Sequence, residues 1–385
     1  MAAHHRHSHP PYPDLVAPDS IPVSSPNYLV LDNSGSCEAA RIDAATSSCL
    51  ELFLPSRASV RDTPQPCIDS PLLELLDDEP NRMRSTLDTS TLSEARLEQL
   101  EKLAARLGVQ VVKVAPGDLL ELSVSTFQQV RKILERPQRA KHHVRLVRVA
   151  SRVASVIAEI MYSQGSGRLA REWWTTSIQA AQEAGDNNLL DLAVASLAYI
   201  PTYGGRPDIV LDLVRPRIDQ QRPCTPAVAW LWGTAARAHA LAGDTHLFEK
   251  AIAQSHNVLI QSDPTQIGPG IFSFTPHKHA FYNADGYTSL GRSKDAIEAA
   301  NHALAMYDPA DTTEPALVRL DCAIVLAQQG DLDGACEHAI AAISAPNTFL
   351  SVTVRSWANR FDSHLDPDDP AAANWRERYH AALHA

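Results

Sequence analysis

The chain has 385 residues, of which 44% are apolar and 21% are charged, a composition that excludes a wholly disordered protein. Its formal net charge of −11 argues against holding nucleic acid by whole-protein electrostatics, although a local basic patch stays open. The six cysteines form no CxxC pair or zinc-ligand spacing, and no stretch is apolar over about 18 residues. We therefore expect free thiols, no membrane span and a cytoplasmic location.

Residues 1–88 differ in composition from the rest of the chain. They hold eleven of the 26 prolines, and their six arginines face thirteen Asp and Glu residues. Segments 27–32 (NYLVLD) and 49–54 (CLELFL) could form short strands, but no helical periodicity is present. The histidines near the start have no carboxylate or cysteine to complete a metal site. We expect an acidic, Pro/Ser-rich arm that is mostly disordered.

A helical pattern begins at residue 89. Leucines recur at helical spacing over residues 91–108, with Ser93 as the expected N-cap and Gly108 as the expected stop. A second helix is predicted over residues 116–137, between two prolines. We take residues 89–140 as a helical entry segment and residues 141–385 as a helical repeat array.

A basic segment spans the junction of these two regions. Residues 130–152 contain eight Arg or Lys side chains against the single acid Glu135. One interpretation is a patch for phosphate or an acidic partner, which the acidic arm could also cover. The other is the solvated face of an amphipathic helix that packs Val144 and Val147 inward. The residues proposed for this basic patch are Arg139, Lys141, Arg145 and Arg148.

Five turn-like glycine signals recur along the array. They stand at Gly165, Gly204, Gly243, Gly291 and Gly330, with separations of 39, 39, 48 and 39 residues. Seven residues before each glycine, the sequence has small or apolar side chains: Ala158, Leu197, Ala236, Ala284 and Ala323. Five residues after each glycine it has Ala170, Ile209, Phe248, Ala296 and Ala335. The pattern predicts an all-α stack of helical hairpins, in which each first helix ends at a glycine.

The clearest copy of the unit resembles the tetratricopeptide repeat (TPR). Segment 290–309 (LGRSKDAIEAANHALAMYDP) has the glycine, the two alanines and the trailing proline of that motif. The period is 39 residues rather than about 34, and an insertion lies near residues 260–275. The resemblance implies a right-handed superhelix of stacked hairpins whose first helices line a concave groove.

A narrower resemblance covers segments 168–186, 203–216, 270–309 and 314–339. They look like the C-terminal sensor half of actinobacterial Xre-type helix-turn-helix transcriptional regulators. The DNA-reading helices of that family have no counterpart in this chain, which makes direct DNA binding doubtful. The resemblance implies a transcriptional-regulator-type module or an accessory to an intact regulator.

Motifs for catalysis are missing from the sequence. It has no GxxxxGK[ST], GxGxxG, GxSxG or HExxH, so we predict a non-enzymatic protein with no catalytic residues, metal or cofactor. In the TPR-like register, the groove for a peptide, small ligand or protein partner would be lined by Glu159, Tyr162, Trp230, Arg237, Lys278, Phe281, Asp285 and Gln328. The alternative is a pure protein–protein interaction scaffold with no ligand, and a homodimer stays open.

Overall fold

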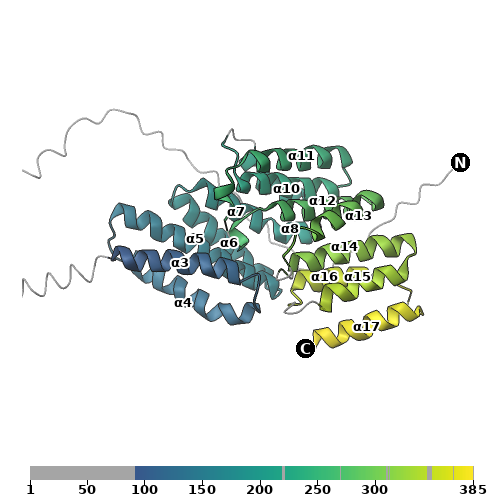
Figure 1. The fold of residues 1–385 in the computed structure, drawn as a ribbon. Coiled ribbons are helices and arrows are strands. Elements are labelled where there is room, and N and C mark those ends of the chain that lie inside the picture. The colour runs from purple at the N-terminus through teal and green to yellow at the C-terminus, as the bar shows by residue number, and fades with distance from the viewer. Residues whose placement is uncertain are drawn as a thin grey trace, which may run out of the picture. The chain divides into compact units, whose positions relative to one another are not determined.

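The computed structural model describes residues 92–218, 222–268, 270–308, 311, 313–344, 349–366 and 368–384. Within these ranges every regular element is a helix, so the all-α prediction is confirmed there (Figure 1). The predicted arm 1–88, with its two candidate strands and its histidines, lies outside the described residues. In the part of the chain that is described, no helix has the length and apolarity that crossing a membrane requires.

The entry segment forms two helices and the array forms a series of pairs. The bounds are α3 (Glu94–Gln110), α4 (Pro116–Leu134), α5 (Ala140–Ser163), α6 (Gly167–Glu183), α7 (Asn187–Leu197), α8 (Tyr199–Tyr203), α9 (Pro207–Ile218), α10 (Pro226–Leu241), α11 (Thr245–Gln261), α12 (Pro276–Ser289), α13 (Ser293–Leu304), α14 (Thr313–Gln329), α15 (Leu332–Ser344), α16 (Val352–Asp362) and α17 (Pro370–Leu383). Two short 3-10 helices, η2 (Pro264–Gln266) and η3 (Gly270–Phe272), lie between α11 and α12.

Helices that follow one another pack as hairpins. The pairs are α5 with α6, α7 and α8 with α9, α10 with α11, α12 with α13, and α14 with α15. The first helices also pack against one another, because α10 contacts α7 and α12, and α14 contacts α12 and α16. In addition, α16 contacts α5. The side chains of these first helices therefore share one interior.

A glycine in the left-handed conformation ends the first helix of each of these hairpins. These glycines have positive φ, which costs glycine little because it has no Cβ: Gly165 (87°), Gly205 (65°), Gly243 (79°), Gly291 (69°) and Gly330 (85°). The amide after each one donates to the carbonyl five residues earlier, as from Ser166 to Met161 and from Asp331 to Leu326. This is the Schellman motif, which satisfies carbonyls that the helix end leaves free.

The second of these turns corrects the sequence prediction by one residue. Gly204 has φ −84° and only caps α8, whereas Gly205 takes the left-handed position. Counted from Gly205, the residues seven positions before the glycines are all alanines with no exposed surface: Ala158, Ala198, Ala236, Ala284 and Ala323. Leu197 and Ile209 were therefore the wrong members of the two registers, and Ala198 and the buried Val210 replace them.

The start of α3 follows the prediction and its end does not. Ser93 is the N-cap and accepts a hydrogen bond from the amide of Arg96 at 3.3 Å. The helix continues through Gly108 to Gln110, so the predicted stop at Gly108 is wrong. A Cβ at Gly108 would overlap the ring of Phe272. This glycine admits the aromatic ring against the helix rather than ending the helix.

The predicted insertion near 260–275 links two hydrophobic clusters. Ile271 and Phe272 pack against the cluster formed by α3, α4, α5 and α6. Phe274 is fully buried in the cluster of the later hairpins, where its ring stacks on Trp230 at 6.0 Å between centroids. The insertion thus joins the entry segment to the middle of the array.

Candidate functional site

Seven of the eight residues predicted for the groove come together on the first helices of the hairpins. They meet side chains that the sequence interpretation missed, and we call the whole set the first-helix cluster. Its members are Glu159 and Tyr162 of α5, Tyr199 and Tyr203 of α8, Trp230 and Arg237 of α10, Lys278, Phe281, Tyr282 and Asp285 of α12, Glu314 and Asp321 of α14, and Trp357 of α16. The eighth predicted residue, Gln328, is exposed near the end of α14 and belongs to none of these contacts.

One end of the first-helix cluster surrounds an ammonium group. Nζ of Lys278 lies 4.0 Å from the ring centroid of Trp230 and 3.3 Å from Oε1 of Glu314. The second oxygen of Glu314 accepts a hydrogen bond from the Tyr307 hydroxyl at 3.0 Å. Both groups retain some exposure, 10% for the side chain of Lys278 and 29% for that of Glu314.

Glu159 lies near this pair and makes no hydrogen bond or ion pair with any residue of the described chain. Its side chain is partly exposed, yet burial raises the pKa of its carboxyl to about 7. The charge of Lys278 opposes this shift and that of Glu314 adds to it. Glu159 is therefore an accessible acid that lacks a cation of its own.

Aromatic rings connect the ends of the first-helix cluster. The ring of Tyr199 stacks on that of Tyr162 at 6.3 Å and lies 6.0 Å from that of Trp230. Tyr203 lies 6.1 Å from Tyr199 and packs edge-on against Trp357 at 5.1 Å. α8 presents these two tyrosines as a short separate helix because Pro201 has no N–H to donate to the carbonyl of Leu197, where α7 ends.

A buried ion pair occupies the middle of the cluster. Nε of Arg237 lies 2.7 Å from Oδ2 of Asp285, and neither side chain has more than 5% of its surface exposed. The guanidinium also lies over the rings of Tyr203 and Tyr282, at 4.8 Å from each centroid. Desolvation is the largest influence and opposes its charge, but Asp285 together with Tyr203 and Tyr282 outweighs it and holds the pKa of Arg237 above its usual value. The charges of Arg237 and Asp285 therefore compensate each other within the protein.

Asp321 is a second acid with a raised pKa. It has no exposed surface, its Oδ1 accepts a hydrogen bond from Nε1 of Trp357 at 2.9 Å, and its Oδ2 has no partner. Burial, together with the nearby charge of Asp285, raises the pKa of this carboxyl to about 8. Trp357, which donates this hydrogen bond, also packs on Tyr203. Asp321 therefore helps to position the aromatic rings of the cluster.

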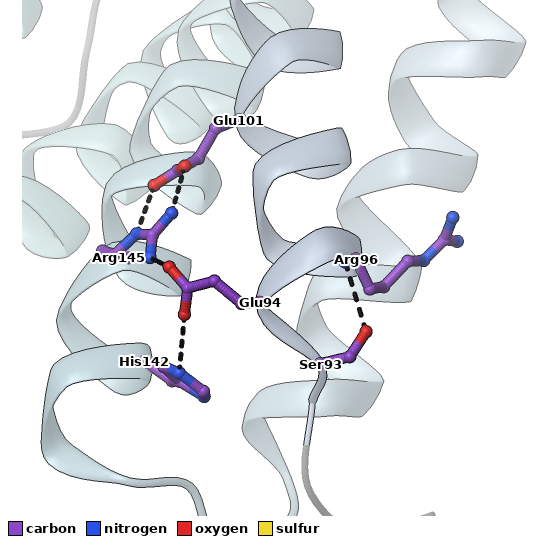
Figure 2. Close-up of polar contacts among 6 residues, drawn as sticks. All are labelled: Ser93, Glu94, Arg96, Glu101, His142 and Arg145. Atoms are coloured by element: carbon purple, nitrogen blue, oxygen red, sulfur yellow. Dashed lines mark hydrogen bonds and ion pairs between the residues drawn. The ribbon is translucent and has the colours of Figure 1, made fainter.

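Two of the four residues of the predicted basic patch are paired with acids of the chain. Arg145 reaches from α5 to α3, where its Nε and Nη2 bind the two oxygens of Glu101 at 2.7 and 2.6 Å (Figure 2). Its Nη1 pairs with Glu94, and the hydrogen bonds from Arg145 lower the pKa of both carboxyls. Nε of Arg148 lies 2.9 Å from Oδ2 of Asp186.

The remaining patch residues, Arg139 and Lys141, are exposed. Nearby, Lys132 and Arg136 line a pocket of about 380 Å³ at the end of α4. On the other side of α5, Val147 is buried and Val144 is half-buried, as expected for an amphipathic helix. Arg145 and Arg148 are therefore neither a free patch nor a purely solvated face, since they pair with acids and tie α5 to α3 and to the start of α7.

Sequence reasoning missed Tyr199 because of the one-residue error at Gly204. Counted from the five turn glycines, the position six residues earlier holds Glu159, Tyr199, Arg237, Asp285 and, before the last glycine, the apolar Ile324. The buried alanines one position before these residues would have revealed the correct count. Trp357 and Glu314 carried no comparable signal, because they lie outside that register.

Comparison with known proteins adds no name to this arrangement. No protein-family model matches the chain, and no curated protein is detectably similar to it. In the described ranges no three His, Cys, Asp or Glu side chains are placed to hold a metal ion. The described cysteines, Cys224, Cys322 and Cys336, are free thiols as expected.

Proposed function

We propose that this protein is a non-enzymatic, TPR-like regulatory or sensor module, of the transcriptional-regulator type, that binds a peptide, small ligand or protein partner at the first-helix cluster. The single observation that carries the proposal is that side chains from α8, α10 and α14 surround Lys278 of α12, beside one accessible, unpaired acid, Glu159 of α5. A helix array built only for packing has no need of such a group, because an uncompensated carboxyl costs stability.

The repeat supports the architectural part of the proposal. Glycine-capped first helices and a register of buried alanines are what a stack of close-packed helical hairpins requires. We infer that the hairpins stack as a right-handed TPR-like superhelix. The sequence resemblance to the sensor halves of Xre-type regulators supports a role in transcriptional control through a partner.

The placement of the cluster suits a regulatory switch. A ligand at Glu159 and Lys278 would contact the first, third and fourth hairpins together through α5, α10, α12 and their rings. Its binding energy would then favour one packing of those hairpins over others. A surface elsewhere on the array, read by a partner, would change with it.

The test is native mass spectrometry of the full chain isolated from its own cells, combined with identification of co-purified proteins and small molecules. We expect a bound molecule on the wild-type chain and less of it on a Tyr199→Phe, Glu159→Gln double variant. The matched control is Tyr287→Phe, Glu298→Gln, because Glu298 is exposed on α13 and Tyr287 packs against Phe248, outside the cluster.

Three outcomes separate the possibilities. Loss of the bound molecule from the Tyr199→Phe, Glu159→Gln variant, but not from the control variant, supports the proposal. If protein partners bind the test variant and the control variant equally and no small ligand is found, the alternative function, a protein–protein interaction scaffold, is favoured. A bare wild-type chain, without ligand or partner, would contradict both functions.

A further inference from the structure

We propose that the first-helix cluster receives a cationic nitrogen group, an ammonium or guanidinium on the bound molecule, beside Glu159. This inference rests on the proposed function, since it names the class of ligand for the same site. It is carried by the balance of charges around Glu159, by the aromatic lining and by the exposure of the acids.

The charges near Glu159 are short of one cation. The charged groups that face it are Lys278 and Glu314, and these two are already paired at 3.3 Å. The next cation along the cluster, Arg237, is bound to Asp285. With both glutamates ionised, this end of the cluster carries two negative charges and one positive charge. A ligand cation would complete the second pair.

The aromatic lining has the chemistry that binds cations. The rings of Tyr162, Tyr199 and Trp230 lie side by side in this region, and the faces of such rings attract ammonium and guanidinium groups. The chain itself shows this attraction, because Nζ of Lys278 lies over Trp230 and 5.7 Å from the ring centroid of Tyr199. Tyr162, three residues after Glu159 on α5, places a ring beside the unpaired acid.

An anion or a neutral group fits these surroundings less well. An anionic ligand would meet Glu159 and Glu314 and would have to compete with Glu314 for Lys278. A neutral apolar group would bury a carboxyl without a partner. Because Glu159 and Glu314 both keep exposed surface, a ligand can approach them without separating the helices.

The test measures binding of four small probes that share one carbon chain. n-Butylammonium and n-butylguanidinium carry the cation, 1-butanol is neutral and butyrate is an anion. Isothermal titration or ligand-observed NMR on the full chain would give their affinities for the wild type, Glu159→Gln and Glu298→Gln. Glu298 is the control because it is an exposed acid on α13 with no contact to the cluster.

We expect both cations to bind the wild type at least about tenfold more tightly than 1-butanol or butyrate. Glu159→Gln should lower the affinity for both cations about tenfold, and Glu298→Gln should leave that affinity unchanged. Because the cation binds the ionised carboxyl, wild-type affinity should rise by up to about tenfold per pH unit below about pH 7 and level off above it. Glu159→Gln should remove that dependence.

Equal binding of butanol or butyrate, or unchanged cation binding in Glu159→Gln, would overturn the inference. So would binding of none of the four probes. The pH dependence of the wild type tests the same point without any variant, should Glu159→Gln fold poorly. The proposed function is judged separately, because a neutral or anionic molecule found on the chain by native mass spectrometry would support it while refuting the cation.

Discussion

Two carboxyl groups of the first-helix cluster are harder to ionise than ordinary carboxyls. The carboxyls of Glu159 and Asp321 have pKa values of about 7 and about 8, because burial outweighs the cations nearby. Each folded-state pKa lies above the unfolded value, so the folded protein binds these protons more tightly than the unfolded chain does. Stability then falls as pH rises from the unfolded pKa to the folded one, and stays reduced above it.

Glu159→Gln should reduce this pH dependence. The ionisation cost is absent below the ordinary pKa of 4.5, grows up to about pH 7 and is then constant. We expect the variant to match the wild type near about pH 4.5 and to exceed it above about pH 7 by on the order of 2 kcal/mol. Urea unfolding at several pH values measures this, with Glu298→Gln as the control. A difference between Glu159→Gln and wild type that does not grow with pH would contradict the assigned environment.

Asp321 offers a second test, based on its hydrogen bond. Asp321→Asn keeps an acceptor for Nε1 of Trp357, whereas Asp321→Leu leaves that buried donor without one. At about pH 6, where the wild-type carboxyl is protonated, we expect Asn to be close to wild type and Leu to lose about 1–3 kcal/mol of unfolding free energy. Trp357 fluorescence should shift in the Leu variant. Equal stability of the two variants would mean that the hydrogen bond does not matter.

Individual helices were predictable where the determinants are local. Ser93 caps α3 through an amide three residues away, and Pro116 begins α4, so both starts could be found in the sequence. The errors arose where a helix end depends on backbone hydrogen bonding or on a contact with a residue distant in sequence. Two adjacent glycines, Gly204 and Gly205, are equivalent in sequence, and only the hydrogen bond from Arg206 to Pro201 selects the second as the turn. Gly108 continues its helix because Phe272, far along the chain, packs on it.

Alanine substitutions at a turn glycine and at a helical glycine should have opposite effects on the free energy of unfolding. Gly291 has φ 69° and Gly117 in α4 has no positive φ, while neither has a neighbour within 4 Å of an added Cβ. Gly291→Ala should therefore lose about 1 kcal/mol from backbone strain alone. Gly117→Ala should be neutral or gain up to about 1 kcal/mol, because alanine favours the helix. Urea unfolding of both variants measures this, and similar effects at the two sites would refute the left-handed turn at Gly291.

On the scale of the whole described chain, spacing predicted the repeated hairpins but not how the chain's parts are joined. Besides the packing of α6 on α7 and the rings of α8, the cluster of α3–α6 and the cluster of the later hairpins are joined by the insertion and by the contact of α16 with α5. At that contact, Val352 lies 3.7 Å from where a Cβ on Gly165 would stand. Such contacts join residues far apart in sequence, so no periodicity encodes them. The groove residues were predictable only because they repeat with the helices.

Phe272→Ala tests whether the insertion holds the entry helices to the array. The ring fills the space above Gly108 and lies 6.0 Å from the guanidinium carbon of Arg152, and the side chain is half-buried. Its loss should lower the unfolding free energy by about 1–3 kcal/mol, less than for a fully buried ring. Hydrogen exchange should rise in α3 more than in α13, because α3 loses its contact with η3.

The control for that experiment is Ile260→Ala, at the end of α11 immediately before the insertion. Its side chain is 66% exposed, so the change should stay within about 0.5 kcal/mol and leave exchange in α3 unaltered. If Phe272→Ala raises exchange equally in α3 and α13, the ring stabilises the chain globally and does not join its parts. If α3 alone loses protection, this ring couples the entry segment to the middle of the array, in addition to the packing of α3 on α5, and a ligand that shifts α12 would act on α3 through the same insertion.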